Sequence, residues 1–316
     1  MVIDRESIER DLREYLDSDV RFILDVGGYI LNGGGKRLRP ILVLKFAKAV
    51  GGYIPENTYP IAYAMEYLHT ASLLHDDVVD GSQTRRGRPT ANIVFGNPTC
   101  VLTGDYMYSL ALYLFSIYGD IDMIRNVSNS VKKMAEGQLL ELKRIGDINT
   151  SMEDYFKIIE GKTAVLFGSC CYVGTGTVSK IQDLKDRAYK FGLNMGLAFQ
   201  IVDDVLDYTA DPGKLGKTVL NDLREGKMTY PLISILSNLN QEERDFISKL
   251  LKDVDPVEEE LLKARDIVVK HGGIENSIRK AKHLVNIAIE NLRDLPETVE
   301  KRELIEMATF IVEREF

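Results

Sequence analysis

Asp76-Asp77-Val78-Val79-Asp80 and Asp203-Asp204-Val205-Leu206-Asp207 repeat one pattern, in which two aspartates are followed by a third after two apolar residues. The apolar periodicity before each stretch predicts a long helix, over about 58–80 and 181–208. The first and last aspartates of each stretch are four residues apart, so they share one helix face. Like charges at this spacing near a helix C-terminus repel each other and oppose the helix dipole. Each cluster is therefore expected to have a stabilising partner.

A divalent cation is the partner that this pattern favours. Mg²⁺ binds one or two carboxylates and completes its shell with water and substrate phosphate oxygens. Two carboxylate clusters that oppose each other across a cavity would therefore hold several Mg²⁺ ions on one diphosphate. The alternative is a solvated acidic helix end, because short acidic motifs also arise by chance. The apolar residues before both clusters, and the repetition itself, argue against that alternative.

Helical periodicity continues outward from the clusters, and no alternating strand pattern of useful length occurs. No linker rich in proline or serine divides the chain, so we expect one all-α domain over 1–316. Loops are predicted at 81–89 and about 209–227. The other predicted helices cover about 4–17, 20–31, 40–50, 98–118, 121–145 and 152–172, with four or five more in 228–316.

The composition is that of a globular protein, with 45% hydrophobic and 28% charged residues among 316. The formal net charge of −8 disfavours nucleic acid as a partner, but it allows a local basic site. Cys100, Cys170 and Cys171 match neither a disulfide framework nor a zinc motif, which predicts a cytoplasmic location. No run of about 18 apolar residues occurs, and the N-terminal stretch lacks an apolar signal core, so no transmembrane helix is expected.

Basic residues gather in the loops beside the aspartates. Residues 33–40, Gly-Gly-Gly-Lys-Arg-Leu-Arg-Pro, place cations at a glycine-rich turn and a helix N-terminus, which favours an anion. Arg85-Arg86 follow the first cluster, Lys217 and Lys227 follow the second, and Gly161-Lys162-Thr163 interrupts a helix. Each of these alone is more often a solvated surface charge. Together with the two carboxylate clusters they predict two diphosphate sites, one held through metal and one by cations alone.

In order and spacing, these motifs resemble those of the trans-isoprenyl diphosphate synthases (polyprenyl synthetases) over about residues 5–310. The resemblance implies a large all-α bundle of the isoprenoid synthase type, with both clusters at the mouth of a central cavity. It also implies a prenyltransferase that is typically a homodimer. The matching motifs are 34–40, 76–80 with 85–87, Glu136-Gly137-Gln138, 161–163, 200–207, and 216–217 through 222–227.

The resemblance assigns roles residue by residue. Asp76, Asp80 and Asp203 resemble the principal ligands of Mg²⁺, of which three ions are expected with substrate bound. Asp77, Asp204 and Asp207 resemble residues that support the metal ions directly or through water, and Lys162 and Lys217 are counted with the aspartates as catalytic. The residues that resemble contacts to the allylic diphosphate are Arg85, Lys162, Thr163, Gln200, Lys217 and Lys227. The residues that resemble contacts to isopentenyl diphosphate are Lys36, Arg39, His69 and Arg86.

His69 also has a simpler interpretation, because a lone histidine on an apolar helix is usually a core residue. Its helix carries the first aspartate cluster, which favours the functional role. His75 and Asp105 are expected to be structural.

The implied reaction begins with cleavage of the allylic C–O bond, which Mg²⁺ favours by neutralising the diphosphate. The double bond of isopentenyl diphosphate then attacks the allylic cation, and a proton is lost to the departing diphosphate. No side-chain nucleophile is required, but water must be excluded because it would quench the cation.

Product length is predicted from the helix that ends at the first cluster. Ala71 and Ser72, five and four residues before Asp76, are small, whereas short-chain relatives commonly place an aromatic residue there. One helical turn rises about 5.4 Å, comparable to one isoprene unit, so an open path beyond Ala71 predicts a product of about C30 to C50. Octaprenyl diphosphate is the best single prediction. Tyr67 or Leu68, or Tyr108 and Tyr113 of a neighbouring helix, are the alternatives that would stop the chain at a geranylgeranyl or farnesyl product.

Two other classes of protein remain as alternatives. A class I terpene cyclase would carry a different second metal motif and would lack the cations of a second diphosphate site. A non-catalytic partner subunit would usually have lost one aspartate cluster, and both are present here. The apolar product predicts release at a membrane surface, although no basic amphipathic helix requires it.

Overall fold

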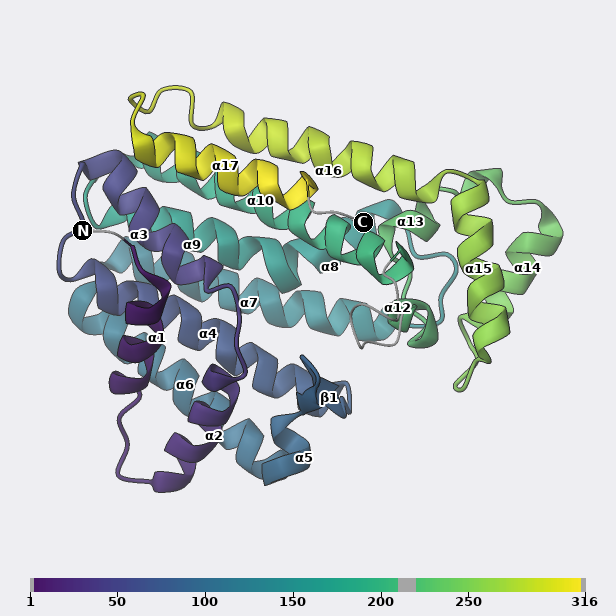
Figure 1. Cartoon of the computed structure of the whole chain (residues 1–316), viewed down its shortest axis with the longest axis horizontal. Coiled ribbons are helices and arrows are strands. Elements are labelled where there is room, and N and C mark those ends of the chain that lie inside the picture. Colours follow the sequence, from purple (N-terminus) through teal and green to yellow (C-terminus); the bar gives the residue numbers. More distant parts are fainter. Residues whose placement is uncertain (1–2, 210–219, 314–316) are drawn as a thin grey trace. The chain divides into compact units, whose positions relative to one another are not determined.

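The computed structural model describes residues 3–209 and 220–313, and helices make up most of them (Figure 1). The all-α prediction is confirmed. The helices of the N-terminal part are α1 (Arg5–Glu14), α2 (Arg21–Asn32), α3 (Leu38–Gly51), α4 (Thr58–Val79), α5 (Ala91–Phe95), α6 (Asn97–Tyr118) and α7 (Ile121–Arg144). They are followed by α8 (Met152–Ile159), a π-helical turn (Glu160–Ala164), α9 (Val165–Gly176), α10 (Gln182–Thr209), α12 (Asn221–Arg224) and α13 (Tyr230–Ile233). The last elements are a 3₁₀ turn (Leu236–Asn238), α14 (Gln241–Leu250), α15 (Glu258–Lys270), α16 (Gly273–Glu290) and α17 (Val299–Glu313).

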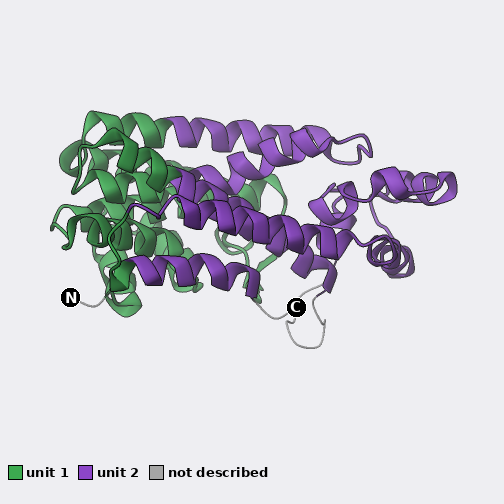
Figure 2. Ribbon diagram, turned by 90° about the horizontal axis from the view of Figure 1, so that it is seen from above, with its two compact units in different colours: residues 1–128, 169–189, 295–300 green, residues 129–168, 190–294, 301–316 purple. Residues whose placement is uncertain are grey.

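Two compact units make up the chain (Figure 2). Unit 1 comprises residues 1–128, 169–189 and 295–300, and unit 2 comprises 129–168, 190–294 and 301–316. Helices α7, α9, α10 and α17 contribute residues to both units. The expectation of one domain over 1–316 stays a prediction.

Helix α4 is the buried helix of unit 1, because apolar residues occupy nearly its whole circumference rather than one stripe. Two tyrosines of α4 connect it to α1 through hydrogen bonds. Tyr63 donates a hydrogen bond to a carboxylate oxygen of Asp11 over 2.6 Å, and Tyr67 donates to the carbonyl of Leu12 over 2.5 Å. Helix α6 packs directly against α4, where the missing side chain of Gly104 leaves room for the ring of His75. The helix carrying the first aspartate cluster is thus held on two sides.

Close helix packing in unit 2 also depends on small residues. A β-carbon at Gly161 would lie 2.6 Å from the carbonyl oxygen of Lys133, and one at Gly196 would lie 2.7 Å from the Cα of Ala164. Such distances are far shorter than carbon contacts allow, so glycine is required at both crossings. These crossings bring α7 and α10 against the π-helical turn.

The structure refines several predicted elements. The helix predicted over 152–172 runs from 152 to 176, with the π-helical turn inside it. The predicted loop at 81–89 contains a hairpin of two short strands, β1 (Thr84–Arg85) and β2 (Arg88–Pro89), and the short helix α5 was not predicted. The turn residues of the hairpin, Arg86 and Gly87, both have positive φ, as a two-residue type I′ turn requires. Residues 210–219 of the second predicted loop lie outside the described residues.

Helix α6 is, in the described part of the chain, the one helix long and apolar enough to cross a membrane by length and composition. Such a composition is also that of a helix buried in a protein, and 39% of its most apolar window is buried here. Several apolar side chains of α6 are solvent-exposed in the single chain, including Leu102, Leu112, Tyr113 and Ile117.

Candidate active site

The first aspartate cluster ends α4. Asp80 is the C-cap residue and is exposed, Asp76 is half-buried, and Asp77 is only 1% exposed. The backbone N–H of Asp80 donates to the carbonyl of Asp76 over 2.8 Å, so the last helical turn is complete. Asp76 and Asp80 therefore share the accessible side of the helix end, as their spacing predicts, and Asp77 points the other way.

Asp77 is bound by Arg85 from the hairpin. Its Oδ1 accepts from Arg85 Nη2 over 2.7 Å and from Nε over 3.0 Å. This charged pair compensates the buried carboxylate and ties strand β1 to the end of α4. Asp77 thus holds Arg85 beside the aspartate cluster. Arg85 is the residue predicted as a contact to the allylic diphosphate.

One basic cluster in unit 1 contains three of the residues predicted to contact isopentenyl diphosphate, namely Arg39, His69 and Arg86. The pKa of His69 is well below its usual value, because of burial and of the neighbouring charges, chiefly Arg39. The pKa of Arg39 is lowered by burial, although Glu66 opposes that shift. His69 is therefore neutral at neutral pH and offers a hydrogen bond rather than a charge to an anion.

The glycine-rich loop completes this basic cluster. A β-carbon on Gly35 would lie 3.1 Å from Nη1 of Arg86, so the loop backbone passes close to that guanidinium. Lys36, from the same loop, is exposed. A cavity of about 30 Å³ beside this region is lined by Asp77, Arg85 and Arg86 among others. The arrangement suits an anion with several oxygens, which arginines bind through paired N–H groups.

The second aspartate cluster lies on α10 in unit 2. Asp204 is 3% exposed and accepts hydrogen bonds from the hydroxyl of Tyr155 over 2.5 Å and from Nε2 of Gln200 over 3.0 Å. Burial raises the pKa of Asp204 to about 7, although these two hydrogen bonds oppose the shift. Asp207 accepts from the backbone N–H groups of Asn221 and Asp222, and Asp203 is half-buried. Asp204 and Asp207 are thus both engaged by groups of the protein itself, and their predicted part in metal binding, direct or through water, stays a prediction.

The π-helical turn positions Lys162 and Thr163. A π turn inserts one residue into a helix and re-aims the side chains at that point. The hydroxyl of Thr163 donates to Oε1 of Gln200 over 2.8 Å, and Gln200 in turn donates to Asp204. The predicted residues Thr163, Gln200 and Asp204 therefore form one hydrogen-bonded chain.

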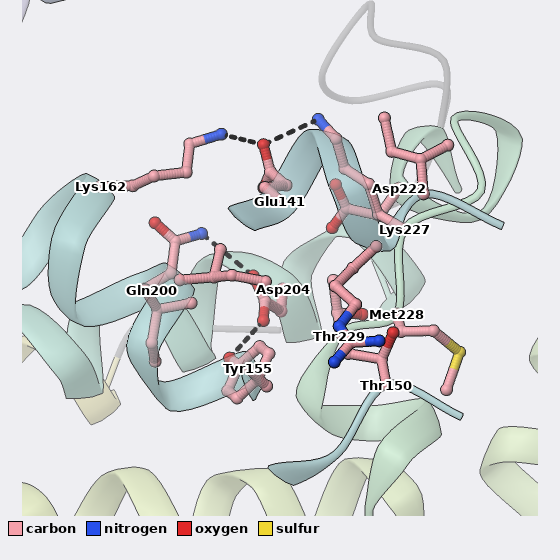
Figure 3. Close-up of a pocket in the computed structure, with 14 residues that line it drawn as sticks. Glu141, Thr150, Tyr155, Lys162, Gln200, Asp204, Asp222, Lys227, Met228 and Thr229 are labelled. Atoms are coloured by element: carbon pink, nitrogen blue, oxygen red, sulfur yellow. Dashed lines mark hydrogen bonds and ion pairs between the residues drawn. The ribbon is translucent and has the colours of Figure 1, made fainter. Parts of the chain in front are cut away.

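Lys162 and Lys227 both point toward Glu141 of α7 (Figure 3). Lys162 forms a short ion pair with Oε2 of Glu141, and Nζ of Lys227 lies 4.0 Å from the same oxygen. Lys227 also pairs with Glu225 over 2.5 Å. Glu141, Lys162 and Lys227 line a cavity of about 200 Å³, and Gln200 and Asp204 lie in its wall. Both lysines are held at this cavity by Glu141, and an ammonium group is a donor that can bind a phosphate as a point charge.

The structure thus brings together most predicted residues within each unit. Lys36, Arg39, His69, Arg85 and Arg86 belong to unit 1, whereas Lys162, Thr163, Gln200 and Lys227 belong to unit 2. Lys217 lies outside the described residues. Glu66, Glu141 and Tyr155 were missed by the sequence analysis. Glu141 follows the Glu136-Gly137-Gln138 motif by one helical turn, and this position is the signal in the sequence that could have identified it.

The donor set fits a divalent metal that binds few protein ligands. Among residues 3–209 and 220–313, no group of three or more histidine, cysteine or acidic side chains is arranged to hold a metal ion by itself. Mg²⁺ needs only one or two carboxylates and takes its other ligands from water and phosphate oxygens. Asp76 with Asp80, and separately Asp203, provide such carboxylates at accessible helix positions.

The residues predicted to set product length all lie on α4. Ala71 is fully buried and Ser72 is half-buried, and both side chains are much smaller than an aromatic ring. Leu68 and Tyr67 are fully buried one turn earlier. The hydroxyl of Tyr67 is directed to the carbonyl of Leu12, so its ring lies toward α1. Tyr113 is 62% exposed in the single chain.

Known proteins resemble this chain over nearly its whole length. The sequence profile of the family described as polyprenyl synthetase matches residues 20–268. The octaprenyl diphosphate synthase of Escherichia coli is 37% identical, and the match covers 99% of this chain and 96% of that protein. The geranylgeranyl diphosphate synthase of Saccharolobus solfataricus is 32% identical, covering 96% and 93%. The solved polyprenyl synthase of Caulobacter crescentus, complexed with calcium and isoprenyl diphosphate, has a TM-score of 0.92 at 32% identity, covering 98% of this chain and 94% of that one.

An all-α fold with two carboxylate clusters and adjoining basic residues defines the class of isoprenoid synthases. The chain belongs to the polyprenyl synthetase family, and it is therefore an enzyme, a prenyltransferase of the trans-prenyl diphosphate synthases. Enzymes of this family generally use a divalent metal, and their substrates are an allylic diphosphate and isopentenyl diphosphate. The relatives differ in product length, and their names include geranylgeranyl, octaprenyl, nonaprenyl and decaprenyl diphosphate synthases.

Proposed function

We propose that this enzyme elongates an allylic diphosphate with successive isopentenyl diphosphates, head to tail and in the trans configuration, to a product of about C30 to C50. Octaprenyl diphosphate is the proposed product. The observation that carries the proposal is the small side chain of Ala71, fully buried on α4 five residues before Asp76, a position where an aromatic side chain would block a path along the helix. The 37% identity to an octaprenyl diphosphate synthase supports it.

We assign Mg²⁺ as the metal, held by Asp76, Asp80 and Asp203, with three ions when substrate is bound. When bound there, Mg²⁺ neutralises the leaving diphosphate and so favours ionisation of the allylic substrate. Asp77, Asp204 and Asp207 would support the ions directly or through water, and the hydrogen bonds described above hold these carboxylates in place. The carboxylate chemistry of both clusters supports this assignment, since Mg²⁺ prefers oxygen ligands.

The basic residues divide between the two substrates. Arg85, Lys162, Thr163, Gln200, Lys217 and Lys227 are assigned to the allylic diphosphate. Lys36, Arg39, His69 and Arg86 are assigned to isopentenyl diphosphate. The clustering of Arg39, His69 and Arg86 in unit 1, and of Lys162, Thr163, Gln200 and Lys227 in unit 2, supports this division for every described residue except Arg85, which lies with the first cluster.

The enzyme needs no side-chain nucleophile, because isopentenyl diphosphate attacks the allylic cation and the released diphosphate accepts the proton. The apolar surroundings of α4 serve to exclude water, which would trap the cation. We further propose that the enzyme is a cytoplasmic homodimer that releases its apolar product at a membrane surface. The exposed apolar side chains of α6 support a contact between subunits.

Product sizing tests this function. The purified enzyme is incubated with farnesyl diphosphate, isopentenyl diphosphate and Mg²⁺, and the dephosphorylated products are sized by mass spectrometry. We expect a ladder that ends at C30 or beyond and disappears when Mg²⁺ is chelated. A ladder that stops at C20 would leave a prenyl diphosphate synthase but overturn the long-chain assignment. Cyclised hydrocarbon without elongation would overturn the second diphosphate site.

A further inference from the structure

The glycine-rich loop before α3 carries three cations that differ sharply in environment. Lys36 is exposed and Arg39 is half-buried, whereas Arg37 between them is only 6% exposed. An arginine is seldom buried unless its charge is paired, so the environment of Arg37 calls for a specific partner.

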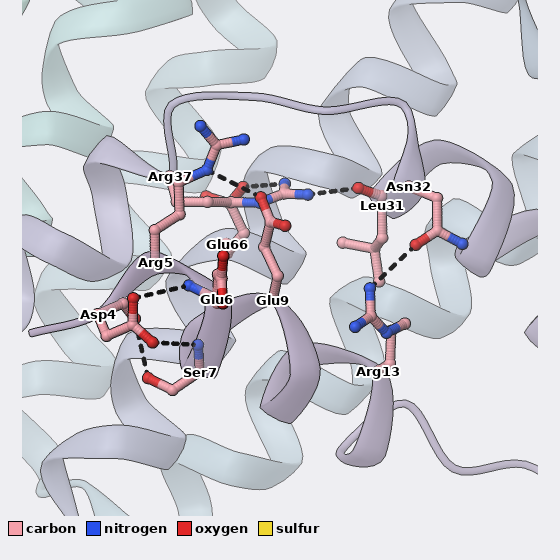
Figure 4. A network of polar contacts seen from close by, with 10 residues as sticks. All are labelled: Asp4, Arg5, Glu6, Ser7, Glu9, Arg13, Leu31, Asn32, Arg37 and Glu66. Carbon is pink, nitrogen blue, oxygen red and sulfur yellow. Dashed lines mark hydrogen bonds and ion pairs between the residues drawn. The ribbon is translucent and has the colours of Figure 1, made fainter.

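That partner is Glu66 of α4, itself 3% exposed (Figure 4). Nη1 of Arg37 donates to Oε1 of Glu66 over 2.8 Å, and Nη2 donates to the carbonyl of Leu31 at the end of α2. Nε of Arg37 lies 3.6 Å from Oε1 of Glu9 on α1. The guanidinium of Arg37 therefore connects the glycine-rich loop to α1, α2 and α4.

The backbone at Arg37 shows what this contact maintains. Arg37 is the N-cap residue of α3 and has a φ of 50°, a left-handed conformation that costs energy for any residue with a side chain. Gly34 and Gly35 before it also have positive φ. The loop thus holds an unfavourable turn directly between Lys36 and Arg39, and the buried ion pair fixes it.

The carboxylate of Glu66 also acts electrostatically on the other basic residues of the cluster. Its charge favours the protonated forms of both Arg39 and Arg86, so its electrostatic influence reaches the proposed isopentenyl subsite. His69 follows Glu66 by three residues and shares its face of α4. The ion pair is therefore next to the subsite without being part of its accessible surface.

We propose that Arg37 and Glu66 are positioning residues for the isopentenyl diphosphate subsite: their ion pair anchors the glycine-rich loop to α4 and sets the positions of Lys36 and Arg39. This inference rests on the proposed function of those two residues. Arg37 itself does not contact the diphosphate, because turning it outward would leave Glu66 as an unpaired buried carboxylate.

The sign of one effect separates positioning from direct binding. Glu66→Gln removes the negative charge next to the cations of the subsite, which raises the local positive potential. It also weakens the ion pair that holds Arg37. If Arg37 positions the loop, KM for isopentenyl diphosphate rises about tenfold while KM for the allylic substrate and kcat stay within about twofold. If Arg37 instead binds the diphosphate, releasing it from Glu66 lowers that KM, and the proposal is overturned.

A double variant removes instability as an explanation. Replacing a buried ion pair by apolar residues of similar volume often preserves stability, so Arg37→Met with Glu66→Met should unfold near the wild-type denaturant midpoint. Its KM for isopentenyl diphosphate should nevertheless stay about tenfold raised. A stable double variant with a wild-type KM would show that the pair is structural only.

Two controls complete the test. Tyr63→Phe removes the hydrogen bond to Asp11 that joins α1 to the same helix, and it should leave KM for isopentenyl diphosphate unchanged. Lys36→Gln should raise that KM if the subsite itself is correctly assigned. Failure of the wild-type enzyme to elongate, or of Lys36→Gln to change KM, would count against the proposed function. A normal KM in the Glu66 and double variants alone would count against this inference.

Discussion

Gly137 of α7 and Gly161 of the π-helical turn are packed against one another so closely that neither position has room for a side chain. A β-carbon on Gly137 would lie 3.0 Å from the Cα of Gly161, and one on Gly161 would lie 2.9 Å from the Cα of Gly137. The contact matters because Lys162 and Thr163 follow Gly161 directly. The spacing of two helix backbones therefore decides where two proposed diphosphate contacts lie.

Gly161→Ala should accordingly damage both stability and allylic binding. Overpacking at such a crossing typically costs about 1–3 kcal/mol in the free energy of unfolding, and here it also shifts the turn that carries Lys162. We expect a lower midpoint in urea and a raised KM for the allylic diphosphate. Gly28→Ala is the matched control, since a β-carbon there meets no atom within 4 Å. A normal allylic KM in Gly161→Ala would show that the turn tolerates displacement.

Tyr155→Phe should destabilise unit 2 through Asp204. The hydroxyl of Tyr155 donates to this buried carboxylate over 2.5 Å, and its loss leaves one acceptor unsatisfied. Such a loss costs about 1–3 kcal/mol, measurable by urea denaturation at neutral pH. Tyr113→Phe, at an exposed position of α6, controls for removal of a hydroxyl as such. Equal unfolding midpoints for both variants would mean that the hydrogen bond contributes nothing to stability.

The pH dependence of stability should carry a contribution from His69. Burial and the charge of Arg39 lower its pKa in the folded chain well below the value of 6.5 that applies when unfolded. As the pH falls below 6.5, the unfolded chain binds a proton that the folded chain does not, so stability is lost toward acid. One such group contributes up to about 1.4 kcal/mol per pH unit.

His69→Asn removes the imidazole that binds this proton in the unfolded chain. Between neutral pH and about pH 5, the variant should therefore lose less stability on acidification than the wild type does, because the titration of Asp204, with a pKa of about 7, is common to both proteins. The measurement is a series of urea unfolding curves across this range. Identical slopes for the two proteins would show that His69 titrates normally in the folded chain.

The sequence was sufficient for the fold class and for the pairing of Asp76 with Asp80, because helical periodicity and i, i+4 spacing are local properties. It also placed a break at Gly161. It did not indicate that Asp77 and Asp204 would be buried beneath Arg85 and Tyr155, since those partners come from other elements.

Glu66 and Arg37 show the same limit more clearly. In the sequence, Glu66 is one polar residue in an apolar helix and Arg37 is one cation among three. Only the fold brings them within 2.8 Å and turns a presumed surface charge into a buried ion pair. Contacts between residues distant in the chain, and backbone conformations that such contacts stabilise, are not encoded in local periodicity.

Product length gives the most direct test of the role of α4. Ala71 is fully buried, so Ala71→Phe places a ring where the growing chain is proposed to pass, and the largest product should shorten to C15 or C20. Ser72→Ala changes volume little at the neighbouring half-buried position and should leave the product distribution unchanged. Both are read by mass spectrometry of the dephosphorylated products from farnesyl or geranyl diphosphate. Because an added ring also overpacks a buried site, the urea midpoint of Ala71→Phe must be measured alongside. A folded, active Ala71→Phe enzyme that still makes the full-length product would place the chain path elsewhere than beside Ala71.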